Sequence, residues 1–420
     1  MISLNPCLIS YISVYLLSVA LCLAIERINI NYLKKYGQKV PVAFQGVIHE
    51  AELENIIRYT LDNFRFKFVK TSASKTFFLF IIISGVLPWL DENLANTNFL
   101  SAGLIFFAVI GIGEILAGLP FDYYHSFVIE ERYGFNTKTI KIWISDLAKG
   151  LLVMIVLGGF LLSALLLMLK YFGENWWIWA WAGFLCFQFL MTVLYPTIIA
   201  PLFNTFTPLE ESELKTGIKR LAQREGLDIE GIYQMDATRR TRHTNAYFSG
   251  LGKAKRIVLF DSLIQCHSQD EIISILAHEI GHLKKNHIKK QILMTSFVSL
   301  ILFSLAAKMM TWEKIYESFG FSDMSYYVGL FLVGILWEPA NFFLSPVGRA
   351  ISRKFEREAD FYSFGILKTA TPLVTALKKM AKENLSNLRP HPLYVFFNYS
   401  HPPLLERIEY LEAGEMSGGL

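Results

Sequence analysis

Residues 276–291 of the chain read LAHEIGHLKKNHIKKQ, and this stretch decides the fold. It holds two histidines four positions apart, His278 and His282, and Glu279 directly follows the first. Positions i and i+4 lie on one face of a helix, so both imidazoles can reach a single metal ion. A long apolar run begins at Gln291. The segment therefore places a candidate metal site beside a candidate membrane span.

The composition of the whole chain is that of a membrane protein. Of its 420 residues, 53% are hydrophobic and only 18% are charged, whereas a soluble domain carries about a quarter charged residues. The apolar residues form blocks close to the roughly 20 residues that cross a bilayer as a helix. A buried soluble helix is the alternative for the second block, which Gly85 and Pro88 interrupt. The seven predicted spans are 8–25, 76–94, 99–119, 150–169, 177–199, 291–310 and 326–344.

The distribution of basic residues predicts the orientation. Of the 40 lysines and arginines, 37 lie in the connections 27–75, 121–149, 201–290 and 347–420. Positively charged loops stay on the cytoplasmic side of a membrane. We therefore expect the N-terminus outside and the catalytic side in the cytoplasm. The formal charge of +4 requires no nucleic-acid partner, because the basic residues flank membrane spans.

The connection 201–290 has the pattern of a small α+β domain. An amphipathic helix is expected to begin at Ser212 and to end at Gly226. Short apolar runs at 231–236, 244–250 and 256–264 then predict a small antiparallel sheet.

The helix that carries the histidines follows that sheet. Ser268 and Glu271 have the spacing of a capping box at its start. No proline or glycine occurs in 283–291, so we expect this helix to run straight into the sixth span, with the metal roughly 13 Å from the start of the span. On a continuous helix His287 is rotated off the metal-binding face.

A third metal ligand should lie on the same side of the membrane, after two more spans. There the segment 348–366 contains Glu356, Glu358 and Asp360. Glu356 and Asp360 share a helical face, so Glu356 can bind the metal while Asp360 holds a histidine ring. Glu358 is expected to be a solvated charge. Three protein ligands leave a fourth position for a water that Glu279 can activate, with one zinc per chain.

These residues resemble the type I CAAX prenyl protease family, which are gluzincin-type integral-membrane metalloproteases. The resemblance rests on HEIGH at 278–282 and FEREAD at 355–360, and also on PLFNTFTPL at 201–209, HTNAYFSGLGKAKRIVLFDSLI at 243–264 and NYSHPPLLERI at 398–408. It implies zinc bound by His278, His282 and Glu356, with Glu279 as general base. It also implies an α-helical polytopic fold whose spans form a barrel around a water-filled chamber, with a membrane-proximal zincin-like α+β catalytic domain.

Polar residues within the spans agree with such a chamber, because they usually face an interior cavity. They are Glu114, Gln188 and Glu338. The predicted organisation follows the spans. Transmembrane helices one to five occupy 1–200, the first catalytic part 201–290, helices six and seven 291–346, and the second catalytic part 347–420.

Two further segments are candidates for handling a peptide. Asn245, Ala246, Tyr247 and Phe248 form a candidate edge strand for an extended substrate, although Tyr247 and Phe248 also suit an ordinary sheet core. Pro402 and Pro403 favour a helix start, which puts His401 at its mouth and Arg407 inside it. Both side chains could donate to an oxyanion, and the alternative is a capping histidine with a surface arginine. His243 and His267 are expected at the surface.

The resemblance implies removal of three residues after the lipidated cysteine of a prenylated CaaX peptide. A membrane quality-control protease with broad substrates is the alternative enzyme. A seven-helix channel or transporter with a structural metal is the non-enzymatic alternative, and Glu279 argues against it because a structural site needs a fourth ligand and no base. The expected partners are a lipidated peptide or protein and the bilayer. The endoplasmic reticulum, by analogy, and a bacterial inner membrane both suit the topology, and the sequence does not indicate an oligomeric state.

Overall fold

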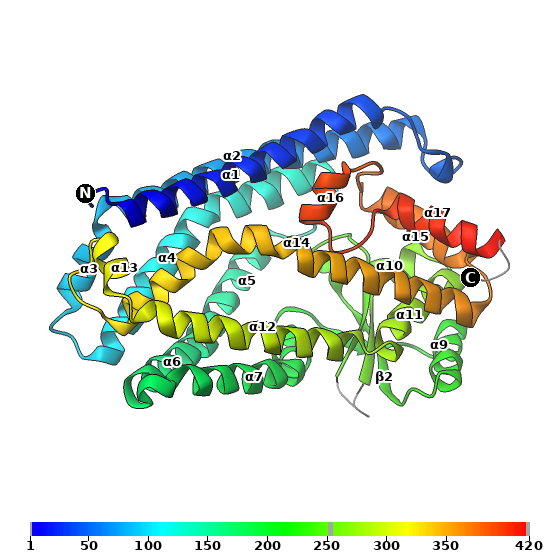
Figure 1. Ribbon diagram of the computed structural model, residues 1–420. Helices are drawn as coiled ribbons and strands as arrows, with labels where there is room; N and C mark the ends of the chain where they lie inside the picture. Colours follow the sequence, from blue (N-terminus) through cyan, green and yellow to red (C-terminus); the bar gives the residue numbers. More distant parts are fainter. Residues whose placement is uncertain (1, 251–254, 417–420) are drawn as a thin grey trace.

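The computed structural model describes residues 2–250 and 255–416 and shows an elongated, mainly helical molecule. Long apolar helices fill one end, and a small sheet with the metal-site helices fills the other (Figure 1). Short 3-10 and π segments flank or join the long helices, among them η1 (Val42–Phe44), η2 (His125–Glu130), η4 (Gly173–Asn175) and η6 (Ala237–Arg239).

Six helices are long and apolar enough to cross a membrane, and a bent pair raises the number to seven, within residues 2–250 and 255–416. The pair is α2 (Glu50–Ser84) and α3 (Val86–Leu94), which meet at 54°. Gly85 makes this bend with φ +85°, a conformation that favours glycine. The multi-pass prediction is confirmed. The remaining spanning segments are α1 (Pro6–Tyr36), α4 (Phe99–Tyr124), α5 (Ile140–Val153) with η3 (Met154–Gly158) and α6 (Gly159–Tyr171), α7 (Trp176–Leu194) with η5 (Tyr195–Ile199) and α8 (Ala200–Phe203), α12 (His287–Met310) and α14 (Tyr326–Leu367).

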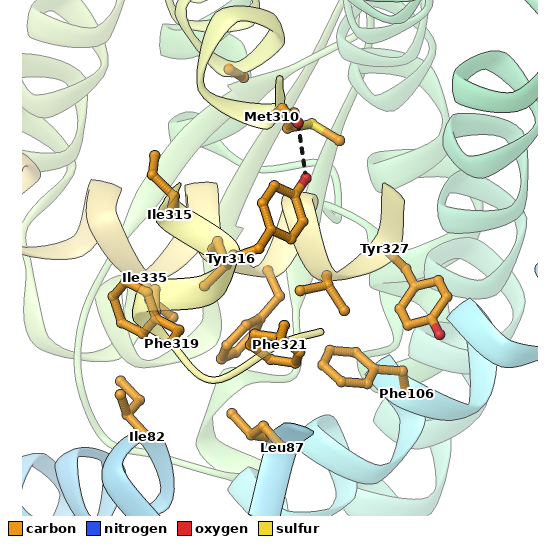
Figure 2. Packing of buried hydrophobic residues seen from close by; sticks show 14 of the residues in the cluster. Ile82, Leu87, Phe106, Met310, Ile315, Tyr316, Phe319, Phe321, Tyr327 and Ile335 are labelled. Atoms are coloured by element: carbon orange, nitrogen blue, oxygen red, sulfur yellow. Dashed lines mark hydrogen bonds between the residues drawn. The ribbon is translucent and has the colours of Figure 1, made fainter. Parts of the chain in front are cut away.

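A hydrophobic cluster joins the spans at the end far from the sheet (Figure 2). The short helix α13 (Glu313–Ser318) places Tyr316 in this cluster, where its hydroxyl donates to the Met310 carbonyl at 3.0 Å. A Cβ on Gly329 would come within 2.2 Å of that hydroxyl, so the glycine is required for α14 to pass. The cluster fixes the start of α14 against the end of α12. These helices lead to and from the metal site.

Charged side chains pair between the spans. Lys75 of α2 binds Glu338 of α14, and Lys67 of α2 binds Glu26 of α1. Glu338 thus has a cationic partner rather than a lipid environment. Gln188 has a buried, unpartnered amide oxygen, whereas Glu114 is exposed.

The sheet contains four strands in the order β1-β2-β4-β3. Its second and third strands in that order, β2 and β4, run parallel, so the purely antiparallel prediction is wrong. The other pairings are antiparallel, and β3 forms an edge of the sheet. Parallel pairing arises because β3 is inserted between β2 and β4 along the chain and lies on the outer side of β4. The strands are β1 (Phe206–Pro208), β2 (Ile229–Met235), β3 (Ala246–Ser249) and β4 (Lys255–Phe260), and α10 (Asp261–Cys266) replaces the rest of the third predicted strand.

Both predicted helix starts in this domain are present. Helix α9 (Glu213–Arg224) begins after Ser212, whose side chain accepts from the Lys215 amide, and Gly226 follows its end at φ +59°. Helix α11 (Gln269–Lys284) begins with the capping box of Ser268 and Glu271.

The predicted continuous helix from the metal site into the sixth span is wrong. Helix α11 ends at Lys284, and α12 begins at His287. Asn286 lies between them in the left-handed region, with φ 56° and ψ 34°. Asparagine enters this region more readily than most residues, so the chain turns without glycine or proline. The break brings His287 back toward the metal site.

The long helix α14 continues from its apolar part into the catalytic domain, where it carries Glu356. Beyond it, α15 (Thr371–Glu383), α16 (Pro392–Asn398) and α17 (Leu404–Met416) complete the fold (Figure 1). Helices α15 and α17 share a hydrophobic core that includes Leu373, Leu377, Ile408 and Leu411.

Candidate metal and catalytic site

Two histidines of α11 and one glutamate of α14 converge on one point. His278, His282 and Glu356 each offer a ligand atom, and these atoms lie within 4.8 Å of one another. The two Nε2 atoms are 3.2 Å apart. Glu356 Oε2 lies 3.3 Å from His278 Nε2, and Glu356 Oε1 lies 3.3 Å from His282 Nε2. The structure thus brings together the three residues that the sequence proposed as ligands.

These separations fit a tetrahedral metal ion. With metal–ligand bonds of about 2.0–2.1 Å, two ligand atoms of a tetrahedron lie roughly 3.3 Å apart. Glu356 Oε2 is buried and makes no hydrogen bond with any described residue, which is costly for a carboxylate unless a cation faces it. Two imidazoles and one carboxylate with a free fourth position are a donor set of catalytic zinc sites.

The close approach of α11 and α14 depends on small residues. A Cβ on Gly281 would lie 2.9 Å from Ala359 Cα and 3.0 Å from its carbonyl oxygen. Gly281 directly precedes His282, and Ala359 lies three positions after Glu356. The absent side chain therefore lets the backbones approach until the ligands meet.

Asp360 and Arg407 orient the first histidine. Asp360 Oδ1 accepts from His278 Nδ1 at 2.8 Å, which leaves Nε2 with a lone pair directed toward the metal position. Arg407 donates to Asp360 through Nε at 2.8 Å and Nη2 at 2.6 Å. Arg407 is only 9% exposed, so the surface alternative is wrong for it. Its Nη1, at 4.0 Å from Glu356 Oε2, is the nitrogen left uncommitted to Asp360.

His287 and Glu358 orient the second histidine, which the sequence did not indicate. His287 is buried, with Nδ1 3.0 Å from His282 Nδ1 and Nε2 3.0 Å from Glu358 Oε2. Its ring stacks on Phe355 at 4.3 Å. Because the Glu358 carboxylate only accepts, His287 donates at Nε2 and accepts at Nδ1 from His282.

His282 Nε2 is therefore free for the metal. The expectation that Glu358 is merely a solvated charge is wrong, and the hydrogen bond from His287 lowers its pKa. The signal that could have revealed this pair was Asn286, which can end a helix in the left-handed conformation.

Glu279 and His401 line a cavity of about 480 Å³ beside the ligands. Burial raises the pKa of the Glu279 carboxyl, while the two imidazoles oppose that shift. His401 directs Nε2 toward Glu356 Oε1 at 3.3 Å, and its Nδ1 lies 3.0 Å from Ser400 Oγ. The helix α17 begins just after Pro403, as its prolines predict, and carries Arg407 inward.

The edge strand β3 reaches the same cavity. Asn245 and Ala246 line it. Phe248 packs against the core beneath the sheet, and Tyr247 packs against Phe260 with ring centroids 6.5 Å apart. The structure therefore places the first half of the four-residue segment at the cavity and gives the second half packing roles.

Of the two histidines expected at the surface, His243 keeps 37% of its side chain exposed, whereas His267 is buried. His267 is 7% exposed. His243 stacks on Phe135 at 4.3 Å and lies between Glu130, at 3.5 Å, and Asn384, at 2.7 Å. Neither belongs to the metal-binding group.

Comparison with known proteins connects this geometry to a family. Residues 29–205 match the family model for the CAAX prenyl protease N-terminal region with five membrane helices, and residues 208–415 match that of peptidase family M48. The chain is 35% identical over 383 residues to a CAAX prenyl protease 1 homolog of Oryza sativa subsp. japonica, covering 89% of this chain and 90% of the relative.

A yeast relative and a solved structure give the same result. CAAX prenyl protease 1 of Saccharomyces cerevisiae is 35% identical and covers 79% of this chain and 76% of its own. The crystal structure of S. mikatae Ste24p superposes with a TM-score of 0.92 at 29% identity, covering 98% of this chain and 100% of that one.

Proposed function

The chain belongs to peptidase family M48, and from this membership we propose that it is a zinc endopeptidase that removes the last three residues of prenylated CaaX peptides. The observation that carries the proposal is the convergence of His278, His282 and Glu356 beside Glu279 and an edge strand. The names of the relatives support the substrate class. A channel with a structural metal would need neither the base nor the cavity.

The residues divide the chemical work. Zinc held by the two imidazoles and Glu356 would polarise the peptide carbonyl and acidify the attacking water. Glu279 takes the proton of that water on its carboxylate and delivers it to the leaving amine. His401 donates from Nε2 to the carbonyl oxygen as negative charge develops there.

The membrane position of the site suits a lipid-bearing substrate. We propose that the N-terminus lies outside and that the site faces the cytoplasm, because the basic residues cluster in the connections on that side.

The test offers the purified full chain a farnesylated CaaX peptide and its unlipidated twin, with and without a zinc chelator. We expect release of the terminal tripeptide from the farnesylated peptide, loss of release with chelator, and recovery on adding zinc. Glu279→Gln should bind about one zinc per chain and lose roughly 10² or more in rate. Glu409→Gln, an exposed change on α17, is the matched control and should behave like wild type.

Two results would contradict the proposal. Tripeptide release by Glu279→Gln at the wild-type rate would remove the assigned base. Equal cleavage of both peptides, at many positions, would favour the broad-substrate alternative.

A further inference from the structure

We propose that the end of the catalytic cavity formed by Asn384, Ser386 and Asn387 is a subsite for the C-terminal carboxylate of the peptide. This inference rests on the proposed function and deepens it, because it explains why a cut would fall three residues from a free chain end. All three side chains line the cavity that also contains Glu279.

Asn384 presents a free amide donor. Its Oδ1 lies 2.7 Å from His243 Nδ1, and His243 Nε2 faces Glu130 Oε2 at 3.5 Å. The protonated ring of His243 can donate to both Asn384 Oδ1 and Glu130 Oε2, so the acceptor atom of Asn384 is already occupied. Its Nδ2 makes no hydrogen bond within residues 2–250 and 255–416.

Asn387 repeats this arrangement three residues later. Its Oδ1 accepts from the Arg389 amide at 3.1 Å. Its Nδ2 is buried and has no hydrogen-bond partner among the residues that the structure describes. A buried donor without an acceptor is costly, and native structures rarely leave one without a reason. The Ser386 hydroxyl, also unpartnered in the part of the chain that the structure describes, adds a donor between the two amides.

The same cavity also has an apolar part of its wall. It contains Leu263, Ile275, Leu373, Leu377 and Met380. Such a wall can hold aliphatic side chains, whereas the three donors can bind only a group that accepts hydrogen bonds. A carboxylate offers two acceptor oxygens and no donor. The ligand is therefore a short apolar peptide with a free acid end.

The direction of the peptide follows from the edge strand and the base. A peptide paired antiparallel to β3 runs past Asn245 toward His243, which contacts Asn384. Glu279 must reach the leaving amine, so the leaving residues lie on its side of the metal. Ile275, one helical turn before Glu279, lines the cavity on that side. Three extended residues span about 10 Å.

The first experiment compares a farnesylated CaaX peptide that ends in an acid with the same peptide as a carboxamide. We expect kcat/KM of the full-length enzyme to be about tenfold or more higher for the acid, the scale of a hydrogen bond to a charged group. Asn384→Ala and Asn387→Ala should reduce this preference to about twofold. Asn387→Asp should reverse it, because a carboxylate repels the acid and accepts from the amide.

Asn398→Ala is the matched control. Asn398 lines the same cavity, but its Nδ2 already donates to the Tyr394 carbonyl at 3.2 Å. This variant should keep the acid preference. Equal rates for acid and amide in the wild type, or equal loss of preference in Asn398→Ala, would overturn the subsite. Zinc content and Tm of each variant identify misfolded protein.

A second experiment separates this inference from the CaaX substrate class. The tripeptide acid and the tripeptide amide compete with hydrolysis of an internally quenched peptide that has no CaaX ending. Stronger inhibition by the acid, lost in the Asn387→Asp variant, supports the subsite even if the farnesylated peptide is not cut. Equal inhibition by acid and amide refutes the subsite even if the farnesylated peptide is cut.

Discussion

Each histidine ligand ends a separate hydrogen-bonded chain that reaches an acidic residue of α14. His278 leads to Asp360 and Arg407, and His282 leads through His287 to Glu358. In both chains a carboxylate accepts a hydrogen bond from an imidazole N–H, and this fixes the tautomer of the ligand ring. The geometry of the candidate metal site is thus supported by residues outside the group of His278, His282 and Glu356.

Substitutions of His401 and of Arg407 should have different effects, although both side chains were candidate donors to the oxyanion. His401→Ala should keep zinc and fold and lose about 10²–10³ in kcat/KM, the scale of one oxyanion donor. Arg407→Ala leaves Asp360 as an uncompensated buried charge, so it should cost about 3–5 kcal/mol of stability and weaken zinc retention. Zinc content, Tm and kcat/KM of both variants test this predicted difference. Normal zinc content and Tm in Arg407→Ala would return the arginine to the oxyanion role.

The second chain predicts a role for His287 in metal retention. His287→Phe keeps a ring against Phe355 but removes the acceptor for His282, and should lower zinc affinity by about 10- to 100-fold. His287→Asn retains an oxygen near the position of Nδ1 and should restore part of the affinity. Chelator competition measures the affinity, and the Tm of the zinc-free protein controls for folding. Wild-type zinc affinity in both variants would show that the hydrogen bonds from His282 through His287 to Glu358 do not contribute to zinc binding.

At the level of elements, the site exists because α11 and α14 cross at van der Waals distance. Their facing residues are Gly281 and Ala359, and Ser363 also donates to the Ser274 carbonyl across the same contact at 3.0 Å. Two backbones this close leave no room for adjustment. Ligands from two helices meet only while the crossing is intact.

Gly281→Ala should therefore damage the metal site without removing a ligand. Its Cβ would sit 2.9 Å from Ala359 Cα, and overpacking of this kind costs about 1–3 kcal/mol. We expect lower Tm and weaker zinc binding, measured by thermal unfolding and chelator competition. Gly365→Ala on α14 meets nothing within 4 Å and serves as control, with unchanged zinc affinity and stability equal or higher by roughly 0.5–1 kcal/mol. A tolerated Gly281→Ala would mean that the crossing can widen without moving Glu356.

At the level of the whole molecule, ion pairs tie the membrane part to the catalytic part. Glu130, in η2 at the end of the span that begins with α4, faces His243 beside the sheet and also accepts from Tyr59 at 2.8 Å. Asp146 of α5 binds Arg240 through Nε and Nη2, both at 2.8 Å. These contacts fix the position of the catalytic part relative to the membrane spans.

The Glu130 contact predicts a dependence of stability on pH. The hydrogen bond to Glu130 raises the pKa of His243, and further groups facing the pair are His125, Tyr59 and Asn384. A raised folded-state pKa gives stabilisation that is complete below about 6.5 and is lost as pH rises through the folded value. The Tm difference between wild type and His243→Gln should thus be largest near pH 6 and shrink toward alkaline pH. A constant difference across this range would contradict the charge pairing.

The orientation in the membrane makes a separate prediction. In a cysteine-free background, a cysteine at position 96 should react with an impermeant reagent from outside. A cysteine at position 255, at the start of β4, should react only after permeabilisation. The reverse pattern would place the catalytic cavity on the outer side.

The sequence alone determined the features that depend on local pattern. Apolar length gave the spans, i and i+4 spacing gave the HExxH ligands and the Glu356–Asp360 face, and side-chain chemistry gave the helix starts at Ser212 and Ser268. Each follows from residues within a few helical turns, where backbone geometry is regular. The resemblance of the motifs supplied the family.

Only the tertiary structure decided what depends on two distant segments meeting. The parallel pairing of β2 with β4 and the binding of Arg407 to Asp360 have no local signal, and Asn286 by itself does not indicate that the turn brings His287 to Glu358. A single residue in the left-handed conformation redirected α12, and a missing Cβ at Gly281 allowed two helices to touch. Local propensities do not encode such events, because their energy comes from partners about 25 to 80 residues away in the sequence.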